Sequence, residues 1–114
     1  EELKYIGTLC VEFFIDRNDN LYVNEIAPRV HNSGHLTINA YNVSQFENHV
    51  RAVCSLKKVS LKKIYNAKMV NLIGSQIEQY RNSNTFGENE FFFDYLKKEI
   101  KAKRKMGHIT TLIK

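Results

Sequence analysis

The sequence predicts an α+β fold, in which a β-hairpin with one or two helices is followed by a smaller β-rich unit. Residues 8–16 and 21–26 are rich in β-branched and aromatic side chains and are joined by a turn cluster, which is the pattern of a hairpin. Ser44-Gln45-Phe46-Glu47 is a capping box, which predicts a helix from there to about residue 55. Three apolar runs predict later strands, and one helical turn is expected between the first two of them, at residues 77–80. These runs are 67–73, 91–96 and 109–113.

The register of the hairpin carries the first functional hypothesis. If 17–20 is a four-residue loop, Asp16 faces Leu21, and Glu12 then lies opposite Glu25. Like charges directly opposite each other repel, and the pair becomes favourable when a cation lies between them. Magnesium prefers carboxylate oxygens together with substrate phosphates, so the pair predicts a Mg²⁺–nucleotide site. A register that differs by one residue would instead leave Glu12 as an ordinary exposed strand residue.

The stretch from Asn24 to His35 is too polar for a core segment. It holds a carboxylate, an arginine, two histidines, two asparagines and Pro28, the only proline. Arg, His and Asn side chains at close spacing suit an anionic, oxygen-rich ligand. A short helix is expected from Ser33 to Asn42, capped by Asn32 or Ser33, with its N–H groups available to an anion. The alternative is a polar surface loop with a helix cap.

Charge divides the chain after residue 56. Residues 1–56 hold four Lys and Arg against seven Asp and Glu, whereas residues 57–114 hold thirteen against five. We therefore expect two domains, 1–56 and 57–114. The basic run 97–105 could bind a phosphorylated metabolite, bind RNA, or form a solvated face. Gly107-His108 is expected to make a tight turn that directs the end of this run at a phosphate.

Composition narrows the class of protein. Hydrophobic residues make up 43% of the 114 positions, which allows a core, and no apolar run approaches the length of a membrane span. We find no signal peptide, and we expect Cys10 and Cys54 to be reduced core thiols of a cytosolic protein. Because the sequence starts at Glu1 without a methionine, we expect a fragment or a processed piece.

Three segments resemble one known family closely. They are Val11-Glu12-Phe13-Phe14, then Asn24-Glu25-Ile26-Ala27-Pro28-Arg29-Val30-His31-Asn32-Ser33-Gly34-His35, then Ser44-Gln45-Phe46-Glu47. Together they resemble the C-terminal part of the N5-carboxyaminoimidazole ribonucleotide synthetases, the ATP-grasp ATPase subunits of phosphoribosylaminoimidazole carboxylase. Arg104-Lys105-Met106-Gly107-His108 resembles the closing motif of that family. The resemblance therefore implies the C-terminal part of an ATP-grasp domain followed by a small β-rich domain.

The resemblance also implies a reaction and its residues. The family is a ligase of purine biosynthesis that activates bicarbonate with ATP, through carboxyphosphate, and carboxylates the amine of aminoimidazole ribonucleotide. Its implied cofactors are Mg²⁺ and ATP, its partners are these small molecules rather than nucleic acid or membrane, and the full-length enzyme is expected to be a cytoplasmic homodimer. The implied site residues are Glu12 and Glu25 for magnesium and ATP, Arg29, His31 and Asn32 for carboxyphosphate, and Lys101, Arg104 and Lys105 for the ribonucleotide phosphate.

The chain departs from the family pattern at the basic run, where Ala102 and Lys103 replace the usual proline and glycine. Nothing in it resembles the family's N-terminal domain, its adenine-binding strands or its phosphate-covering loop, so we expect the chain alone to be inactive. A related formate-using transferase of purine synthesis is one alternative. Its loop has His-Asp-Thr-Gly in place of residues 31–34 and lacks a histidine at position 35. A non-enzymatic basic domain that binds RNA or a partner is the other alternative.

Overall fold

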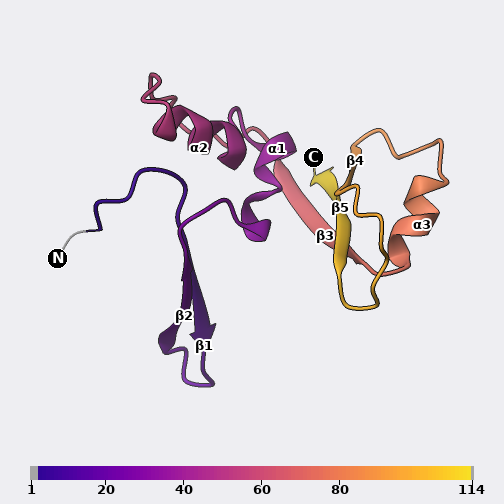
Figure 1. The fold of residues 1–114 in the computed structure, drawn as a ribbon, viewed down its shortest axis with the longest axis horizontal. Helices are drawn as coiled ribbons and strands as arrows, with labels where there is room; N and C mark the ends of the chain where they lie inside the picture. The colour runs from indigo at the N-terminus through magenta and orange to yellow at the C-terminus, as the bar shows by residue number, and fades with distance from the viewer. Residues whose placement is uncertain (1–2, 114) are drawn as a thin grey trace. The chain divides into compact units, whose positions relative to one another are not determined.

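The computed structural model describes residues 3–113, which form two compact units (Figure 1). The first unit contains residues 3–38 and 42–62, and the second contains residues 39–41 and 63–113. The first unit thus includes residues 57–62, which the charge pattern had placed in the second domain. Both strands and helices are present, which confirms the α+β class. Among the described residues, every helix is too short or too polar to cross a membrane.

The first unit begins with the predicted hairpin of β1 (Cys10–Ile15) and β2 (Leu21–Ala27). Its turn is longer than predicted, because Ile15 rather than Asp16 pairs with Leu21. The Asp16 carboxylate accepts hydrogen bonds from the backbone N–H groups of Asn18 and Asn20, at 2.8 and 2.9 Å, and closes the turn. A further hydrogen bond from the Asn20 side chain is the main cause of the lowered pKa of Asp16. The carboxylate therefore organises the loop in place of a ladder pair.

Three short helical segments follow: η1 (Asn32–Gly34), α1 (Thr37–Ala40) and α2 (Gln45–Val53). The predicted helix at 33–42 is broken into the first two, and the cap prediction was wrong. The His31 side chain, not that of Asn32 or Ser33, caps η1 by accepting from the Ser33 N–H. The predicted N-cap of α2 is confirmed, because Ser44 Oγ accepts from the Glu47 N–H at 3.1 Å, while the Glu47 carboxylate accepts from Arg51 Nε at 2.8 Å.

The second unit contains a three-stranded antiparallel sheet with the order β3-β5-β4 and one helix. Its elements are β3 (Asn66–Ile73), α3 (Gln76–Arg81), β4 (Glu90–Asp94) and β5 (Lys105–Ile113). Figure 1 shows α3 beside the sheet. The core of this unit consists of Leu72, Ile77 and Met106, and Tyr80 and Phe92 pack against that core. The unit is therefore β-rich, as expected.

The prediction of a tight turn at Gly107-His108 was wrong. Both residues lie inside the central strand β5, where Gly107 pairs with Leu72 on one side and with Asp94 on the other. Glycine is required there by close packing, since a Cβ at this position would clash with the Phe93 carbonyl oxygen and lie 2.8 Å from Ile77 Cδ1. The Met-Gly-His motif is therefore a structural feature of the core.

The cysteine prediction also needs correction. Both thiols are free, but Cys54 is exposed and Cys10 is only half-buried, so neither is a core thiol. The hairpin is exposed in the same way, since large apolar side chains such as Phe14, Ile15 and Leu21 are each more than 60% exposed. A hairpin with so much exposed apolar surface gains little stability from its own packing.

Candidate functional site

Two carboxylates and one imidazole lie close together in the first unit. Glu12 of β1 and Glu25 of β2 are directly paired across the hairpin, as the sequence predicted. His31, in the loop after β2, brings its Nε2 atom to 2.8 Å from Glu12 Oε1. One ligand atom from each of the three residues lies within 4.8 Å of the other two. We call these three residues the Glu–Glu–His cluster.

A β-bulge makes this pairing possible. The register shifts between Glu12 and Phe13, so that Glu12 pairs with Glu25 while Phe13 pairs with Val23. Asn24 is the extra residue, and its side-chain amide donates to Glu12 Oε2 at 3.3 Å. Bulges bend a strand and re-aim its side chains. Without the bulge, the register of the turn would place Asn24, not Glu25, opposite Glu12.

His31 is held from both ring nitrogens. Its Nδ1 accepts from the Ser33 N–H at 3.3 Å and lies 2.8 Å from Ser33 Oγ. A backbone N–H can only donate, so neutral His31 carries its proton on Nε2 and donates it to Glu12. The imidazole therefore orients one carboxylate of the cluster, as a hydrogen-bonding neighbour orients a metal ligand.

The loop carrying His31 is anchored by residues that the sequence analysis did not single out. The Tyr5 hydroxyl donates to the Pro28 carbonyl oxygen at 2.8 Å. The buried Gln45 side chain accepts from the His31 N–H at 2.9 Å and donates to the His31 carbonyl oxygen at 2.7 Å. In the sequence, Gln45 stands out only as a member of the capping box of α2, and nothing in the local pattern points to Tyr5.

The other two residues predicted for carboxyphosphate lie in the same loop. Arg29 is exposed, and its guanidinium donates to the carbonyl oxygen of adjacent Val30 at 3.0 Å. Asn32 is the first residue of η1 and is half-buried. Arg29 and Asn32 thus lie within three residues of His31 along the chain, on either side of it.

The three basic residues predicted for phosphate binding belong to the second unit. Lys101 Nζ lies 3.2 Å from Glu99 Oε2, and both side chains are well exposed. Arg104 donates to the Glu99 carbonyl oxygen at 3.4 Å, and Lys105 is the first residue of β5. The loop before β5 is therefore turned back on itself around Glu99. Phosphate binding by these side chains stays a prediction.

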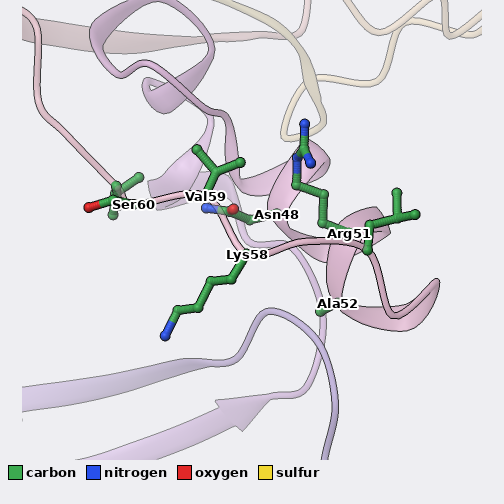
Figure 2. Close-up of a pocket in the computed structure, with 8 residues that line it drawn as sticks. Asn48, Arg51, Ala52, Lys58, Val59 and Ser60 are labelled. Atoms are coloured by element: carbon green, nitrogen blue, oxygen red, sulfur yellow. The ribbon is translucent and has the colours of Figure 1, made fainter.

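A separate pocket of about 480 Å³ lies in the first unit, between α2 and the segment that follows it (Figure 2). Its lining is mixed, with apolar side chains and two cations, of which Arg51 forms an ion pair with Glu47 at 2.7 Å. Figure 2 shows Arg51 and Lys58 pointing away from each other. The lining residues are Asn48, Arg51, Ala52, Leu56, Lys58, Val59, Ser60 and Leu61. None of the predicted site residues lines this pocket.

The Glu–Glu–His cluster fits a hard divalent cation. Two carboxylates facing each other supply the oxygen ligands that Mg²⁺ prefers, and Mg²⁺ usually combines one or two carboxylates with phosphate oxygens and water. A cation would also offset the repulsion between the paired carboxylates. Among the described residues, these three form the one group of three or more acidic, His or Cys side chains close enough to hold a metal ion.

Comparison with protein families gives two matches, one in each half of the chain. Residues 1–46 match the ATP-grasp domain, and residues 67–114 match the phosphoribosylaminoimidazole carboxylase C-terminal domain. Among curated proteins, N5-carboxyaminoimidazole ribonucleotide synthase of Staphylococcus aureus is 46% identical over 114 residues, and that of Bacillus subtilis is 43% identical over 110 residues. These alignments cover 98% and 96% of this chain.

The structural comparison agrees. The N5-carboxyaminoimidazole synthetase of Staphylococcus aureus superposes with a TM-score of 0.85 at 45% identity, covering 96% of this chain and 30% of that one. The Aspergillus clavatus synthase, solved with ADP and 5-aminoimidazole ribonucleotide, gives 0.81 at 35% identity, covering 94% and 30%. The chain spans about 30% of the length of the curated relatives it matches. The resemblance seen in the sequence is thereby confirmed, and the chain is a homologue of part of the N5-carboxyaminoimidazole ribonucleotide synthases, joining an ATP-grasp segment to the C-terminal domain of that family.

Proposed function

We propose that the protein containing this chain is an ATP-dependent ligase of purine biosynthesis, which carboxylates the amine of 5-aminoimidazole ribonucleotide with bicarbonate. The homologues are named for the synthesis of N5-carboxyaminoimidazole ribonucleotide, and one structural neighbour was solved with ADP and 5-aminoimidazole ribonucleotide. The observation in this chain that supports it best is the Glu12–Glu25 pair across a bulged hairpin. We further propose that residues 1–56 belong to the C-terminal part of the ATP-grasp domain, and that the small second domain lies within residues 57–114, of which residues 57–62 pack with the first unit.

The proposed reaction has two steps. A bicarbonate oxygen attacks the γ-phosphorus of ATP, the bond to ADP breaks, and carboxyphosphate forms. The exocyclic amine of the ribonucleotide then attacks the carboxyphosphate carbon, phosphate leaves with the bridging oxygen, and the amine loses a proton. Bound Mg²⁺ would offset the negative charge that develops on the phosphoryl oxygens.

In the first step, Glu12 and Glu25 would hold the divalent cation that accompanies ATP. The His31–Glu12 hydrogen bond fixes the orientation of the Glu12 carboxylate. We propose that Arg29, His31 and Asn32 also hold bicarbonate and then carboxyphosphate. Arginine supplies a planar pair of donors for a carboxylate, and an asparagine amide supplies a directed one. Donors that are already in place lower the barrier because they need no reorganisation as charge develops.

In the second step, Lys101, Arg104 and Lys105 are proposed to bind the phosphate of the ribonucleotide. All three are exposed cations in or beside the loop before β5. The Lys97 side chain reaches the same segment, because its Nζ donates to the Lys105 carbonyl oxygen at 2.6 Å.

Two further properties belong to the proposal. The full-length enzyme is proposed to be a homodimer, as the family resemblance implies. A cytoplasmic location is proposed because both cysteines are free, which suits a reducing compartment.

The test is a steady-state assay of the full-length protein. ADP release should require both bicarbonate and 5-aminoimidazole ribonucleotide for its full rate, and a carboxylated ribonucleotide should appear in step with it. Glu12→Gln should lower turnover and raise the Mg²⁺–ATP concentration needed for half-saturation. ADP release that is indifferent to both co-substrates would overturn the assignment.

A further inference from the structure

Gln45 is a buried polar residue that is hydrogen-bonded to His31 of the Glu–Glu–His cluster. It is 8% exposed and makes three hydrogen bonds to the loop that carries His31. Its Oε1 accepts from the His31 N–H at 2.9 Å, and its Nε2 donates to the His31 carbonyl oxygen at 2.7 Å. The Nε2 atom also lies 2.7 Å from Nδ1 of His35.

The orientation of this amide follows from its partners. A backbone N–H can only donate and a carbonyl oxygen can only accept, so Oε1 must face the former and Nε2 the latter. The second Nε2 hydrogen then points at Nδ1 of His35, which must accept it. Gln45 therefore holds both the N–H and the carbonyl oxygen of His31 in place. It also fixes the tautomer of His35, whose ring stacks on that of Phe46 at a centroid distance of 5.2 Å.

Gln45 is itself fixed from several sides. Its N–H donates to Thr37 Oγ1 at 2.9 Å, and its carbonyl oxygen accepts from Thr8 Oγ1 at 3.2 Å. Gly34 leaves room for the amide, because a Cβ at that position would clash with Gln45 Oε1 and lie 2.7 Å from its Cδ. The first residue of α2 is thus a rigid support, and the glycine of the loop is fitted to it.

We propose that Gln45 is a positioning residue for the carboxylation reaction, which holds His31 against Glu12 and so determines how well bicarbonate is seated. This inference rests on the proposed function. Gln45 touches His31 through the backbone only, so its effect is transmitted by the placement of that residue. Displacement of a reacting group by about 1 Å can cost on the order of a hundredfold in rate.

The test compares Gln45→Met with a matched control in the full-length protein. Methionine keeps the length of the side chain and removes all three hydrogen bonds. Asn42 is the control, because its amide also spans a backbone segment, accepting from the Lys62 N–H at 2.8 Å and donating to the Ser60 carbonyl oxygen at 3.0 Å. Asn42→Leu should leave the kinetics unchanged.

Gln45→Met should lower bicarbonate-dependent kcat/KM by about ten- to a hundredfold, while KM for ATP stays within about twofold of wild type. Hydrogen exchange at the His31 N–H should accelerate in the same variant and not in Asn42→Leu. Wild-type kinetics in folded Gln45→Met would overturn the proposal, and so would a loss accompanied by an equal rise in KM for ATP.

A second variant tests the proposal if Gln45→Met fails to fold. Gln45→Glu keeps the shape and the acceptor for the His31 N–H, but its carboxylate faces the His31 carbonyl oxygen without a donor. A tenfold or greater fall in bicarbonate-dependent kcat/KM supports the proposal, and an unchanged value contradicts it. If wild-type protein shows no bicarbonate-dependent turnover, the proposed function fails, and the exchange rate of the His31 N–H still decides whether Gln45 fixes that residue.

Discussion

Glu25→Gln should have opposite effects on the metal-free and the metal-bound protein. Glu25 is exposed, and its carboxylate lies within 4.8 Å of a ligand atom of Glu12. At that distance two like unit charges repel by about 1 kcal/mol in water and about 3 kcal/mol at an effective dielectric constant of 20. Exposure favours the lower figure. The substitution should therefore stabilise the metal-free protein slightly, by up to about 1 kcal/mol.

The same arithmetic gives the loss of metal affinity. A divalent ion carries two charges, so its attraction to the Glu25 carboxylate is about twice the repulsion calculated above for water. The carboxylate therefore contributes about 2 kcal/mol to metal binding even if the ion lay at the largest separation in the cluster. That corresponds to a rise of about thirtyfold in the metal dissociation constant, since about 1.4 kcal/mol is tenfold. The ion would bind closer than this, so thirtyfold is the minimum expected.

The assay is calorimetric titration of Mg²⁺ into the full-length protein with bound ATP, beside thermal melts with and without metal. Wild type should gain a metal-dependent rise in Tm that Glu25→Gln lacks. Equal metal affinity in the two proteins would refute the assignment of Glu25 as a ligand. A lower Tm of the metal-free variant would refute the argument from charge repulsion.

Three further predictions follow from the two units. Gly107→Ala should lower the free energy of unfolding by about 1–3 kcal/mol, measured by denaturant titration, because its Cβ would clash with the Phe93 carbonyl oxygen. Asp94→Asn should destabilise at neutral pH, because the hydrogen bonds from Arg81, at 2.7 and 2.9 Å, lower the pKa of the Asp94 carboxyl. The loss of stability relative to wild type should be fully present at pH values above 3.8, the ordinary pKa of an Asp carboxyl. It should disappear as the pH falls through the lowered pKa of Asp94 in the folded protein. Thermal melts at several pH values would measure it. Asn32→Ala should reduce bicarbonate-dependent turnover by about a hundredfold in steady-state kinetics and leave KM for ATP and the Tm nearly unchanged, because one transition-state donor is lost.

Each of these has a control in the chain. Gly87→Ala should be milder than Gly107→Ala, because its Cβ would meet the end of the flexible Glu90 side chain rather than backbone. Glu47→Gln breaks a more exposed ion pair, with Arg51, and should change stability less than Asp94→Asn. A loss in Asp94→Asn that stayed constant as the pH fell far below the ordinary carboxyl pKa of 3.8 would contradict the pKa argument. Collapse of the Tm in Asn32→Ala, with normal kinetics of the folded fraction, would make its role structural.

The opposed glutamates were predicted correctly, but two features of the structure had to cancel for that to happen. The sequence predicted a loop of residues 17–20, whereas Asp16 belongs to the loop as well and shifts the register there by one. The bulge at Asn24 then shifts it back before Glu25 is reached. Turn length and bulges depend on side-chain hydrogen bonds, such as those of Asp16, which local propensity does not determine.

Other features could not be found by local reasoning. Gly107 reads as a turn residue, and only the distant Phe93 carbonyl and Ile77 side chain show that it is fitted into a sheet. Gln45 reads as part of a helix start, and its partners His31 and His35 are ten or more residues away. Long-range backbone contacts of this kind depend on how elements pack, whereas strands, caps and apolar faces follow from short periodicities.

The central claim is that bicarbonate is activated by phosphorylation at this site, and oxygen transfer tests it most directly. The full-length protein would be supplied with ¹⁸O-labelled bicarbonate, Mg²⁺–ATP and 5-aminoimidazole ribonucleotide, and the released phosphate analysed by mass spectrometry before the label exchanges with water. Because phosphate leaves carboxyphosphate with the bridging oxygen, each phosphate should carry one oxygen from bicarbonate. Carboxylated product accompanied by unlabelled phosphate would contradict the account.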